Sequence, residues 1–249
     1  MNYGKKLAEG KTKIIYAHPD DPSLVIMLQK DSISAGDGAR RNEIEGKGAL
    51  SGRTATNVFT MLNGVGVPTH FVDAPSPIEM IVRHCGMIPV EVVMRRRATG
   101  SYLKRHPDTV EGTSFDPVLV EFFLKDDRRH DPQLSADELI AQEIASRDEV
   151  AEMTEQGRRV FGLLEQAWAA QDVALIDLKI EFGRDPSGRL VVADMIDNDS
   201  WRIWPGGEKG RMLDKQIYRN MTDVTDEHLQ ALKQKYAQVA DLTERFLVR

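Results

Sequence analysis

The sequence of 249 residues contains a single cysteine, Cys85. One cysteine excludes an intramolecular disulfide and a cysteine-built zinc site, and it favours a reducing compartment. No stretch approaches about 18 consecutive apolar residues, and the first residues lead into no apolar run of signal-peptide length. The sequence therefore predicts a soluble cytoplasmic protein that does not interact with membranes.

Excess charge of one sign is also small. The chain has 33 Lys and Arg against 39 Asp and Glu, a net charge of −6. This mild acidity argues against a protein that binds nucleic acid over a broad surface, although it leaves a local basic pocket open. Hydrophobic residues make up 41% and charged residues 29%, the composition of an ordinary globular chain with one large domain or two small ones.

Side-chain periodicity and turn residues predict an α+β fold of two lobes. We expect strands at 12–16, 24–28, 69–73, 78–82, 87–94 and 117–125, a β-hairpin of 174–182 with 190–196, and helices at 43–62, 148–170 and 226–247. The first two strands, joined by turn residues, predict an antiparallel start. Cys85-Gly86 is the predicted boundary between a β-rich lobe at 1–86 and a larger α/β lobe at 87–249.

The predicted hairpin carries the sharpest chemical signal. Asp177, Lys179 and Glu181 alternate with apolar residues, so all three should point from one face of their strand. A turn centred on residues 185–188 would place Asp194 opposite Lys179 and diagonal to Glu181. Carboxylates in this arrangement suggest a Mg²⁺ site. The alternative is a solvated strand face, and a register slip of one residue would undo the pairing.

Four loops add further polar groups. Glu9-Gly10-Lys11-Thr12-Lys13 resembles the end of a phosphate-binding P-loop, but the earlier glycine is absent and a strand follows instead of a helix, so we reject that motif. Arginines and a hydroxyl within 95–101 could hold a phosphate by forked hydrogen bonds, or could form a solvated basic patch. The polar segments 125–132 and 197–202 could be surface loops or could complete a site with the hairpin.

Together these segments resemble a known family. Glu9 to Lys13, Ser34-Ala35-Gly36-Asp37-Gly38, Arg95 to Ser101, Lys125 to Pro132, Asp177 to Gly183 and Asp194 to Trp204 occur in the order and spacing of the phosphoribosylaminoimidazole-succinocarboxamide synthase (SAICAR synthetase) family. The resemblance covers nearly the whole chain. It implies an antiparallel β-rich, ATP-binding N-terminal lobe of kinase-like or ATP-grasp-like character and a larger α/β lobe.

The resemblance also implies an activity and its partners. The family are ATP-dependent carbon–nitrogen ligases of de novo purine biosynthesis. They join the carboxylate of carboxyaminoimidazole ribotide (CAIR) to the amine of L-aspartate through an acyl phosphate, giving SAICAR, ADP and phosphate. Mg²⁺ is the expected cofactor and ATP a co-substrate, and a homodimer is one possible assembly. The alternatives are a small-molecule kinase of the same fold and a non-catalytic nucleotide-binding module.

Site residues carry over position by position. The resemblance assigns ATP binding to Lys11, Lys13, the backbone around Met87, and Lys125; Mg²⁺ binding to Glu181 and Asp194; CAIR binding to Asp37, Arg95, Ser101, Asp177 and Arg202; and a catalytic part to Lys179 and Asp131. It gives no residues for aspartate.

One position departs from the usual bacterial pattern. Many bacterial members have an acidic residue after the position of Asp194, but Met195 stands here. The segment from 195 to 202 is more similar to the animal form, in which a carboxylase domain is fused to this one, and 249 residues leave no room for that domain. Residue 195 therefore cannot supply a third carboxylate to a metal ion.

Overall fold

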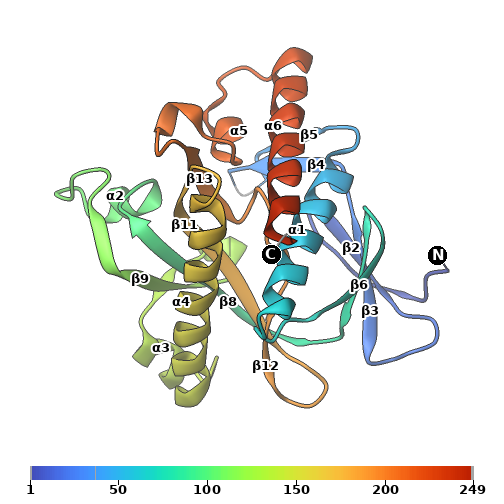
Figure 1. The fold of residues 1–249 in the computed structure, drawn as a ribbon. Helices are drawn as coiled ribbons and strands as arrows, with labels where there is room; N and C mark the ends of the chain where they lie inside the picture. The colour runs from blue at the N-terminus through green and yellow to red at the C-terminus, as the bar shows by residue number, and fades with distance from the viewer. Residues whose placement is uncertain (1, 37, 248–249) are drawn as a thin grey trace. The chain divides into compact units, whose positions relative to one another are not determined.

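A computed structural model describes residues 2–36 and 38–247 of the chain (Figure 1). The chain divides into two compact units, neither of which is continuous in sequence. The first unit contains residues 1–88, 181–199 and 213–249, and the second contains 89–180 and 200–212. The predicted boundary after Gly86 lies two residues before the end of the first segment, but 181–199 and 213–249, expected in the second lobe, return to the first unit.

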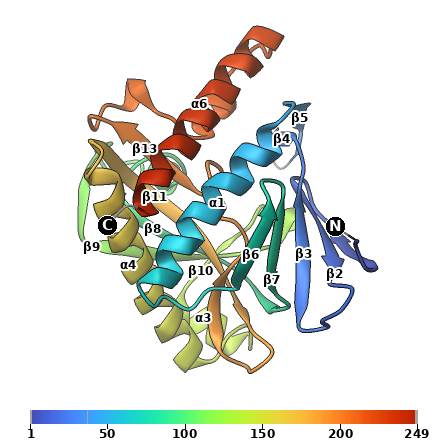
Figure 2. The ribbon, with the colours of Figure 1, turned by 45° about the vertical axis from the view of Figure 1, so that its right-hand side comes forward.

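An antiparallel five-stranded sheet forms part of the first unit. Its strands run in the order β1 (Lys6–Glu9), β2 (Lys13–Ala17), β3 (Leu24–Gln29), β7 (Glu79–Arg83) and β6 (Phe71–Ser76). The predicted antiparallel start is confirmed, because β2 pairs with β3 from Lys13 opposite Gln29 to Ala17 opposite Val25. α1 (Lys47–Gly64) packs on β3, β6 and β7 (Figure 2).

Two long helices and a small hairpin complete much of this unit. α1 packs beside α6 (Asp226–Glu244), and β4 (Ser32–Ala35) pairs with β5 (Arg40–Glu43). The remaining helical segments are α5 (Gln216–Asn220) and the 3₁₀ turn η3 (Arg245–Leu247). Thr225 caps α6 by accepting a hydrogen bond from the backbone N–H of His228. The predicted helix at 43–62 therefore begins four residues later, because β5 takes residues 40–43.

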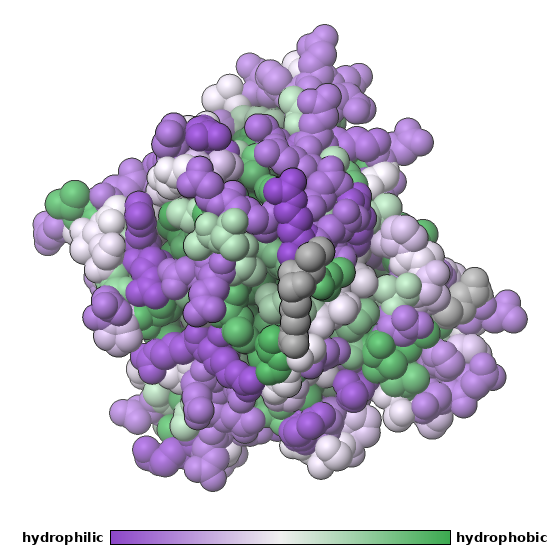
Figure 3. All heavy atoms as spheres, in the orientation of Figure 1, coloured by the Kyte–Doolittle hydropathy of each residue, from purple (hydrophilic) through white to green (hydrophobic). Residues whose placement is uncertain are grey.

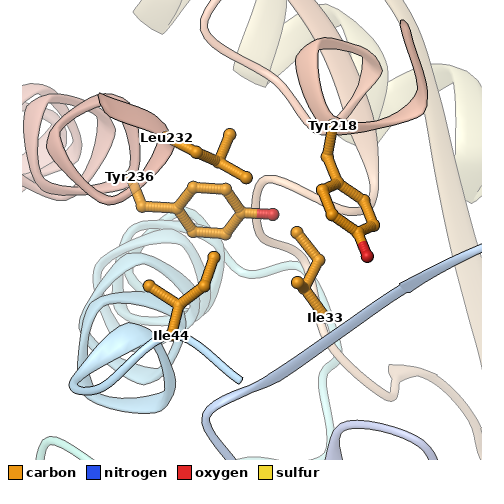
Figure 4. Packing of buried hydrophobic residues seen from close by; sticks show 5 residues of the cluster. All are labelled: Ile33, Ile44, Tyr218, Leu232 and Tyr236. Atoms are coloured by element: carbon orange, nitrogen blue, oxygen red, sulfur yellow. The ribbon is translucent and has the colours of Figure 1, made fainter. Parts of the chain in front are cut away.

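An apolar cluster fixes these helices to the hairpin. Figure 4 shows its five buried residues, which come from β4, the segment between β5 and α1, α5 and α6: Ile33, Ile44, Tyr218, Leu232 and Tyr236. The upper turns of α6 are hydrophilic on the face seen in Figure 3, as expected for an amphipathic helix with one exposed side.

The second unit is built on a twisted antiparallel sheet. Its strands follow the order β10 (Gln133–Leu134), β9 (Ser114–Leu124), β8 (Gly86–Arg97) and β11 (Val173–Arg184), and β13 (Trp201–Pro205) also pairs with β11. Its helical segments are α2 (Ser101–Arg105), η1 (Asp127–Arg129), α3 (Ala136–Ala141), α4 (Arg147–Ala169) and η2 (Lys209–Arg211). Trp168 of α4 packs edge-on against Trp201 of β13, 5.3 Å between ring centroids.

Sequence patterns predicted α4 closely and missed β13. Ser146 and Glu149 form a capping box at the start of α4, and its buried stripe includes Val150, Met153 and Val160. β13 has only five residues and directly follows a polar loop, so the sequence pattern did not predict it as a strand.

Within residues 2–36 and 38–247, none of the helices has the length and apolar character that a membrane span requires.

The predicted hairpin is present, but its predicted register is wrong by one residue. β11 pairs with β12 (Leu190–Ala193), and Glu181 lies opposite Ala193. The pairing ends there, because Asp194 has a φ of +64° and leaves the strand. Asp194 is therefore not across from Lys179. Its side chain is directed by a left-handed backbone conformation and not by the alternation of a strand.

Candidate functional site

Four charged side chains form a row across the sheet of the second unit. Glu121 lies on β9, Arg95 on β8, Asp177 on β11 and Arg202 on β13. Since these strands are neighbours in this order, the charges alternate in sign from one strand to the next. Such cross-strand pairs of opposite charge stabilise a sheet and fix the side chains that compose them.

Strand register explains why these four residues meet. Val93 lies opposite Glu121 and Arg95 opposite Leu119, so Arg95 and Glu121 are diagonal neighbours on one face. Asp177 lies directly opposite Arg202. A bulge between Leu175 and Asp177 shifts this pairing; without it, Arg202 would lie opposite an isoleucine.

The contacts within the row are close. Arg95 donates from Nε to Glu121 Oε2 (2.5 Å) and from Nη1 to Asp177 Oδ2 (3.0 Å). Arg202 donates from Nη1 to the same Oδ2 of Asp177. The side chains of Arg95, Glu121 and Asp177 are only 3%, 3% and 7% exposed, whereas that of Arg202 is 14% exposed. The row is therefore a largely dehydrated network whose Arg202 end reaches solvent.

The start of α2 adds a hydroxyl and a close backbone approach. Arg95 Nη2 lies 3.4 Å from Ser101 Oγ. Gly100, which precedes α2, has a φ of +57°, and a Cβ on it would lie 2.4 Å from Arg202 Nη2. The guanidinium of Arg202 thus packs directly against this glycine. Four of the five predicted CAIR-binding residues are brought together here, while Asp37 lies outside the described residues.

Arg105 completes the cluster and was missed by the sequence analysis. It pairs with Glu121 Oε1, to which Gln133 Nε2 also donates (3.2 Å). Counting Arg95, Arg105 and Arg202 against Glu121 and Asp177 gives one excess positive charge. An arginine cluster with a small positive excess and a nearby hydroxyl suits an oxyanion such as a phosphate monoester.

Two further predicted residues of the second unit lie in the loop after β9. Asp131 has a φ of +47°, and its Oδ1 accepts a hydrogen bond from the backbone N–H of Asp126 (2.8 Å). Lys125 is exposed, and its backbone N–H donates to Pro89 O (2.9 Å). The predicted catalytic Lys179 lies on β11, with its Nζ 3.3 Å from Glu91 Oε1.

The first unit brings together two residues predicted for the nucleotide and the metal. Lys13, at the start of β2, forms an ion pair with Asp194 Oδ1. Gly10 donates its backbone N–H to Lys13 O (2.9 Å), which closes the tight turn that leads into β2. Lys11 lies in that turn, and its backbone carbonyl accepts a hydrogen bond from Ser32 Oγ.

The other predicted residues of this unit differ in exposure. Glu181 is buried on β11, and Met87 is 44% exposed at the start of β8. Met195 is buried, with its sulfur 3.4 Å from Gln29 Nε2. Among the described residues no group of three or more His, Cys, Asp or Glu side chains is arranged to hold a metal ion.

A cluster of charged side chains around Asp199 in the first unit was predicted only in part from the sequence. Asp199 accepts hydrogen bonds from Lys215 Nζ (2.6 Å) and Tyr236 Oη (2.8 Å), and Lys47 Nζ lies 5.3 Å from the Tyr236 ring centroid. Burial opposes ionisation of Asp199, but the two ammonium groups outweigh it and lower the pKa of this carboxyl. Burial and the neighbouring Asp199 raise the pKa of Asp197. The polar segment 197–202 gave the signal for the aspartates, and only the fold could supply Lys47 and Tyr236.

A family profile and the sequences of known proteins identify the same family. The family profile described as SAICAR synthetase matches residues 6–236. A phosphoribosylaminoimidazole-succinocarboxamide synthase of Roseiflexus castenholzii is 68% identical over 249 residues, which is all of both chains. A mouse bifunctional carboxylase and succinocarboxamide synthetase is 44% identical over 254 residues, covering 99% of this chain and 60% of the mouse protein.

Solved structures agree in fold. The phosphoribosylaminoimidazole-succinocarboxamide synthase of Ehrlichia chaffeensis has a TM-score of 0.87 at 29% identity, covering 96% of this chain and 98% of the other. A SAICAR synthetase in complex with ADP has a TM-score of 0.82 at 33% identity, covering 93% and 97%. The predicted α+β class and SAICAR synthase-like fold are thus confirmed.

Proposed function

The chain belongs to the SAICAR synthetase family, the ATP-dependent ligases of purine biosynthesis, and we propose that its first unit binds the nucleotide while the second binds the phosphate of CAIR. The single observation that carries this division is the Arg95–Asp177–Arg202 network with Ser101 beside it, all within the second unit. A phosphate monoester carries about −1.5 to −2 charges near pH 7, and paired guanidinium groups are its natural binding partners.

The proposed contacts to the phosphates of the nucleotide come from the turn between β1 and β2. In our proposal Lys11 and Lys13 contact the phosphates of ATP, and the backbone around Met87 contacts the adenine. The exposure of Met87 leaves its backbone accessible to a ligand. The related structure that contains ADP supports nucleotide binding by this fold.

Glu181 and Asp194 are the proposed Mg²⁺ ligands. Carboxylate oxygens are the hard donors that Mg²⁺ prefers, and one or two of them suffice when substrate phosphates complete the coordination. Glu181 is buried opposite Ala193, and Asp194 follows that residue directly. In the structure the Lys13 ammonium pairs with Asp194. When bound, Mg²⁺ would neutralise charge on the transferring phosphate.

The reaction needs activation of a carboxylate, because a carboxylate is a poor acylating agent. Transfer of the γ-phosphoryl of ATP to the CAIR carboxylate creates a good leaving group, and the aspartate amine then displaces it. We assign Lys179 to stabilise the CAIR carboxylate and the oxyanion that develops on it. Asp131, held by the Asp126 backbone N–H, borders the reacting centre in this proposal. The enzyme mainly positions reactants and balances charge.

One assay tests the proposed reaction. Purified protein is incubated with ATP, Mg²⁺, CAIR and L-aspartate, each is omitted in turn, and ADP and SAICAR are measured. We expect SAICAR only in the complete mixture and ADP in equal amount. ADP formed at the same rate without aspartate, with release of a phosphorylated product, would favour the small-molecule kinase. Nucleotide binding without any ADP would leave a binding module. A cytoplasmic location completes the proposal.

A further inference from the structure

The strongest unassigned feature is the buried carboxylate at the β9 end of the charged row. Glu121 is 4% exposed and accepts hydrogen bonds from three side chains: Arg95, Arg105 and Gln133. A carboxylate buried to this degree is costly unless its acceptor positions are satisfied. The burial of Glu121 therefore depends on these three donors, and no role in the proposed function has been assigned to this residue.

The contacts of Arg95 indicate why a buried carboxylate lies beside it. Its Nε is used by Glu121, one N–H of Nη1 by Asp177 and one N–H of Nη2 by Ser101. Within the described residues, these contacts leave one N–H on each Nη for a bound anion, since a guanidinium has five donors. Glu121 and Asp177 thus hold the guanidinium from two sides and fix the direction of its two remaining N–H groups.

We infer that Glu121 is a positioning residue for CAIR, which fixes the Arg95 guanidinium so that its two remaining N–H groups meet the CAIR phosphate. The inference rests on the proposed assignment of that phosphate to Arg95, Ser101 and Arg202. Glu121 itself does not touch the substrate. It acts because a fork that is held in place loses less rotamer freedom on binding.

Arg105 extends this arrangement. It pairs with the second oxygen of Glu121, and its guanidinium carbon lies 5.0 Å from the ring centroid of Phe123. One carboxylate therefore ties two arginines together. A single charge change at 121 should disturb the orientation of Arg95, whereas a change at 105 should disturb it less, because the Nε bond remains.

A neighbouring ion pair offers a matched control. Arg96, the next residue along β8, points to the other face of the strand and forms two hydrogen bonds with Glu165 of α4, at 2.7 and 2.9 Å. Glu165→Gln therefore makes the same chemical change to an arginine–glutamate pair of the same strand. It does so on a side chain that the proposal does not connect with CAIR.

The experiment compares Glu121→Gln, Glu121→Asp and Glu165→Gln in the full-length enzyme. The measurements are the KM for CAIR, ATP and aspartate, kcat, the melting temperature, and the shift in melting temperature produced by CAIR without ATP. We expect Glu121→Gln to raise the KM for CAIR by about tenfold and to shrink the CAIR-induced shift, with the KM for ATP unchanged. Glu121→Asp keeps the charge but shortens the reach, so it should also raise this KM. Glu165→Gln should leave it unchanged.

Two outcomes overturn the inference. A lower melting temperature for both Glu121 variants with an unchanged KM for CAIR, measured well below unfolding, would show a purely structural role. An equal loss for Glu165→Gln would show a general effect of sheet stability. If Glu121→Gln does not fold, Glu121→Gln with Arg105→Met restores the charge balance and must show the same rise in KM.

The proposed function can fail separately. If Arg202→Ala leaves the KM for CAIR unchanged, the phosphate assignment is wrong, whatever the Glu121 variants do. If Arg202→Ala raises that KM while the Glu121 variants do not, only the positioning role of Glu121 is wrong.

Discussion

Arg202 of β13 lies directly opposite Asp177 of β11, and a one-residue bulge after Leu175 produces that pairing. Asp177 Oδ2 also accepts a hydrogen bond from Arg95. One carboxylate oxygen thus holds two guanidinium groups that would otherwise repel each other. Bulges are frequently found where a side chain must be redirected toward a binding site.

Arg202→Ala tests the phosphate assignment. Each hydrogen bond to a charged group contributes about 1.5–3 kcal/mol, which corresponds to about 10–100-fold in affinity. We expect the KM for CAIR to rise by that factor and the KM for ATP to stay unchanged. Arg202→Lys should recover part of the loss, because an ammonium cannot reproduce the planar fork.

Arg211→Ala is a suitable control, since Arg211 is an arginine of the same unit that is 57% exposed and 3.7 Å from Glu208. It should leave all Michaelis constants unchanged. A loss in Arg202→Ala confined to aspartate would move Arg202 to the amino-acid pocket. No loss at all would make Arg202 merely a structural partner of Asp177.

Gly100→Ala should disturb the position of Arg202. The added Cβ would lie 2.4 Å from Arg202 Nη2, and the positive φ would add backbone strain of about 1–3 kcal/mol. We expect a lower melting temperature and a higher KM for CAIR. Gly112→Ala separates the two effects, because Gly112 has a φ of +87° and, among the described residues, no heavy atom within 4 Å of the added Cβ. It should lower stability without changing the KM for CAIR; equal changes in both variants would contradict the steric argument.

How much of this could be predicted from the sequence depends on the range of the interactions involved. The strands, the long helices and the hairpin follow from local periodicity, so 148–170 and 226–247 were located nearly to the residue. The register of the hairpin was not, because it depends on the length of the connecting loop: Arg184 pairs with Leu190, so residues 185–189 form the loop and not 185–188. Where β12 ends was not predicted either, because the left-handed conformation of Asp194 decides that. The sequence contains no local signal for a positive φ at an aspartate.

The site residues also fall into those predicted from local motifs and those that only long-range contacts reveal. Arg95, Ser101, Asp177 and Arg202 were predicted from motifs, and the structure brings them together. Glu121 was not, because its relation to Arg95 is a diagonal contact between strands that only the β8–β9 register reveals. The return of 181–199 and 213–249 to the first unit depends on long-range packing, such as that of Tyr236 and Tyr218 around Ile33. No local pattern encodes it.

Asp194→Asn should abolish turnover while leaving the fold intact. The amide keeps the shape but loses the negative charge that Mg²⁺ requires. The lost pair with Lys13 is partly exposed, so its contribution to stability is only about 0–1 kcal/mol. ATP with Mg²⁺ should raise the melting temperature of the wild type through binding to the native state, and the variant should show a smaller shift. Asp20→Asn, at an exposed turn of the same unit, should behave as wild type. Near-normal turnover of Asp194→Asn at low Mg²⁺ would exclude Asp194 as a ligand.

The last prediction concerns His70, which is 3% exposed beside Phe59 in the first unit, with ring centroids 5.2 Å apart. Burial, with smaller contributions from Lys13 and Arg83, lowers the pKa of His70 to about 3. The folded protein therefore keeps this ring neutral, whereas the unfolded chain protonates it below a pH of about 6.5. Stability contributed by the neutral ring is fully present above pH 6.5 and is lost as the pH falls toward 3.

The slope of that loss is about 1.4 kcal/mol per pH unit, which amounts to about 2 kcal/mol between pH 6.5 and pH 5. His70→Phe keeps an aromatic ring against Phe59 and removes the titration. Urea unfolding at pH 7.5 and pH 5 should show that the wild type loses about 2 kcal/mol more than this variant. The exposed His84 provides the control, and His84→Gln should follow the wild type. An identical loss in wild type and His70→Phe would mean that His70 is protonated in the folded protein, because a histidine that titrates alike in both states cannot make stability depend on pH.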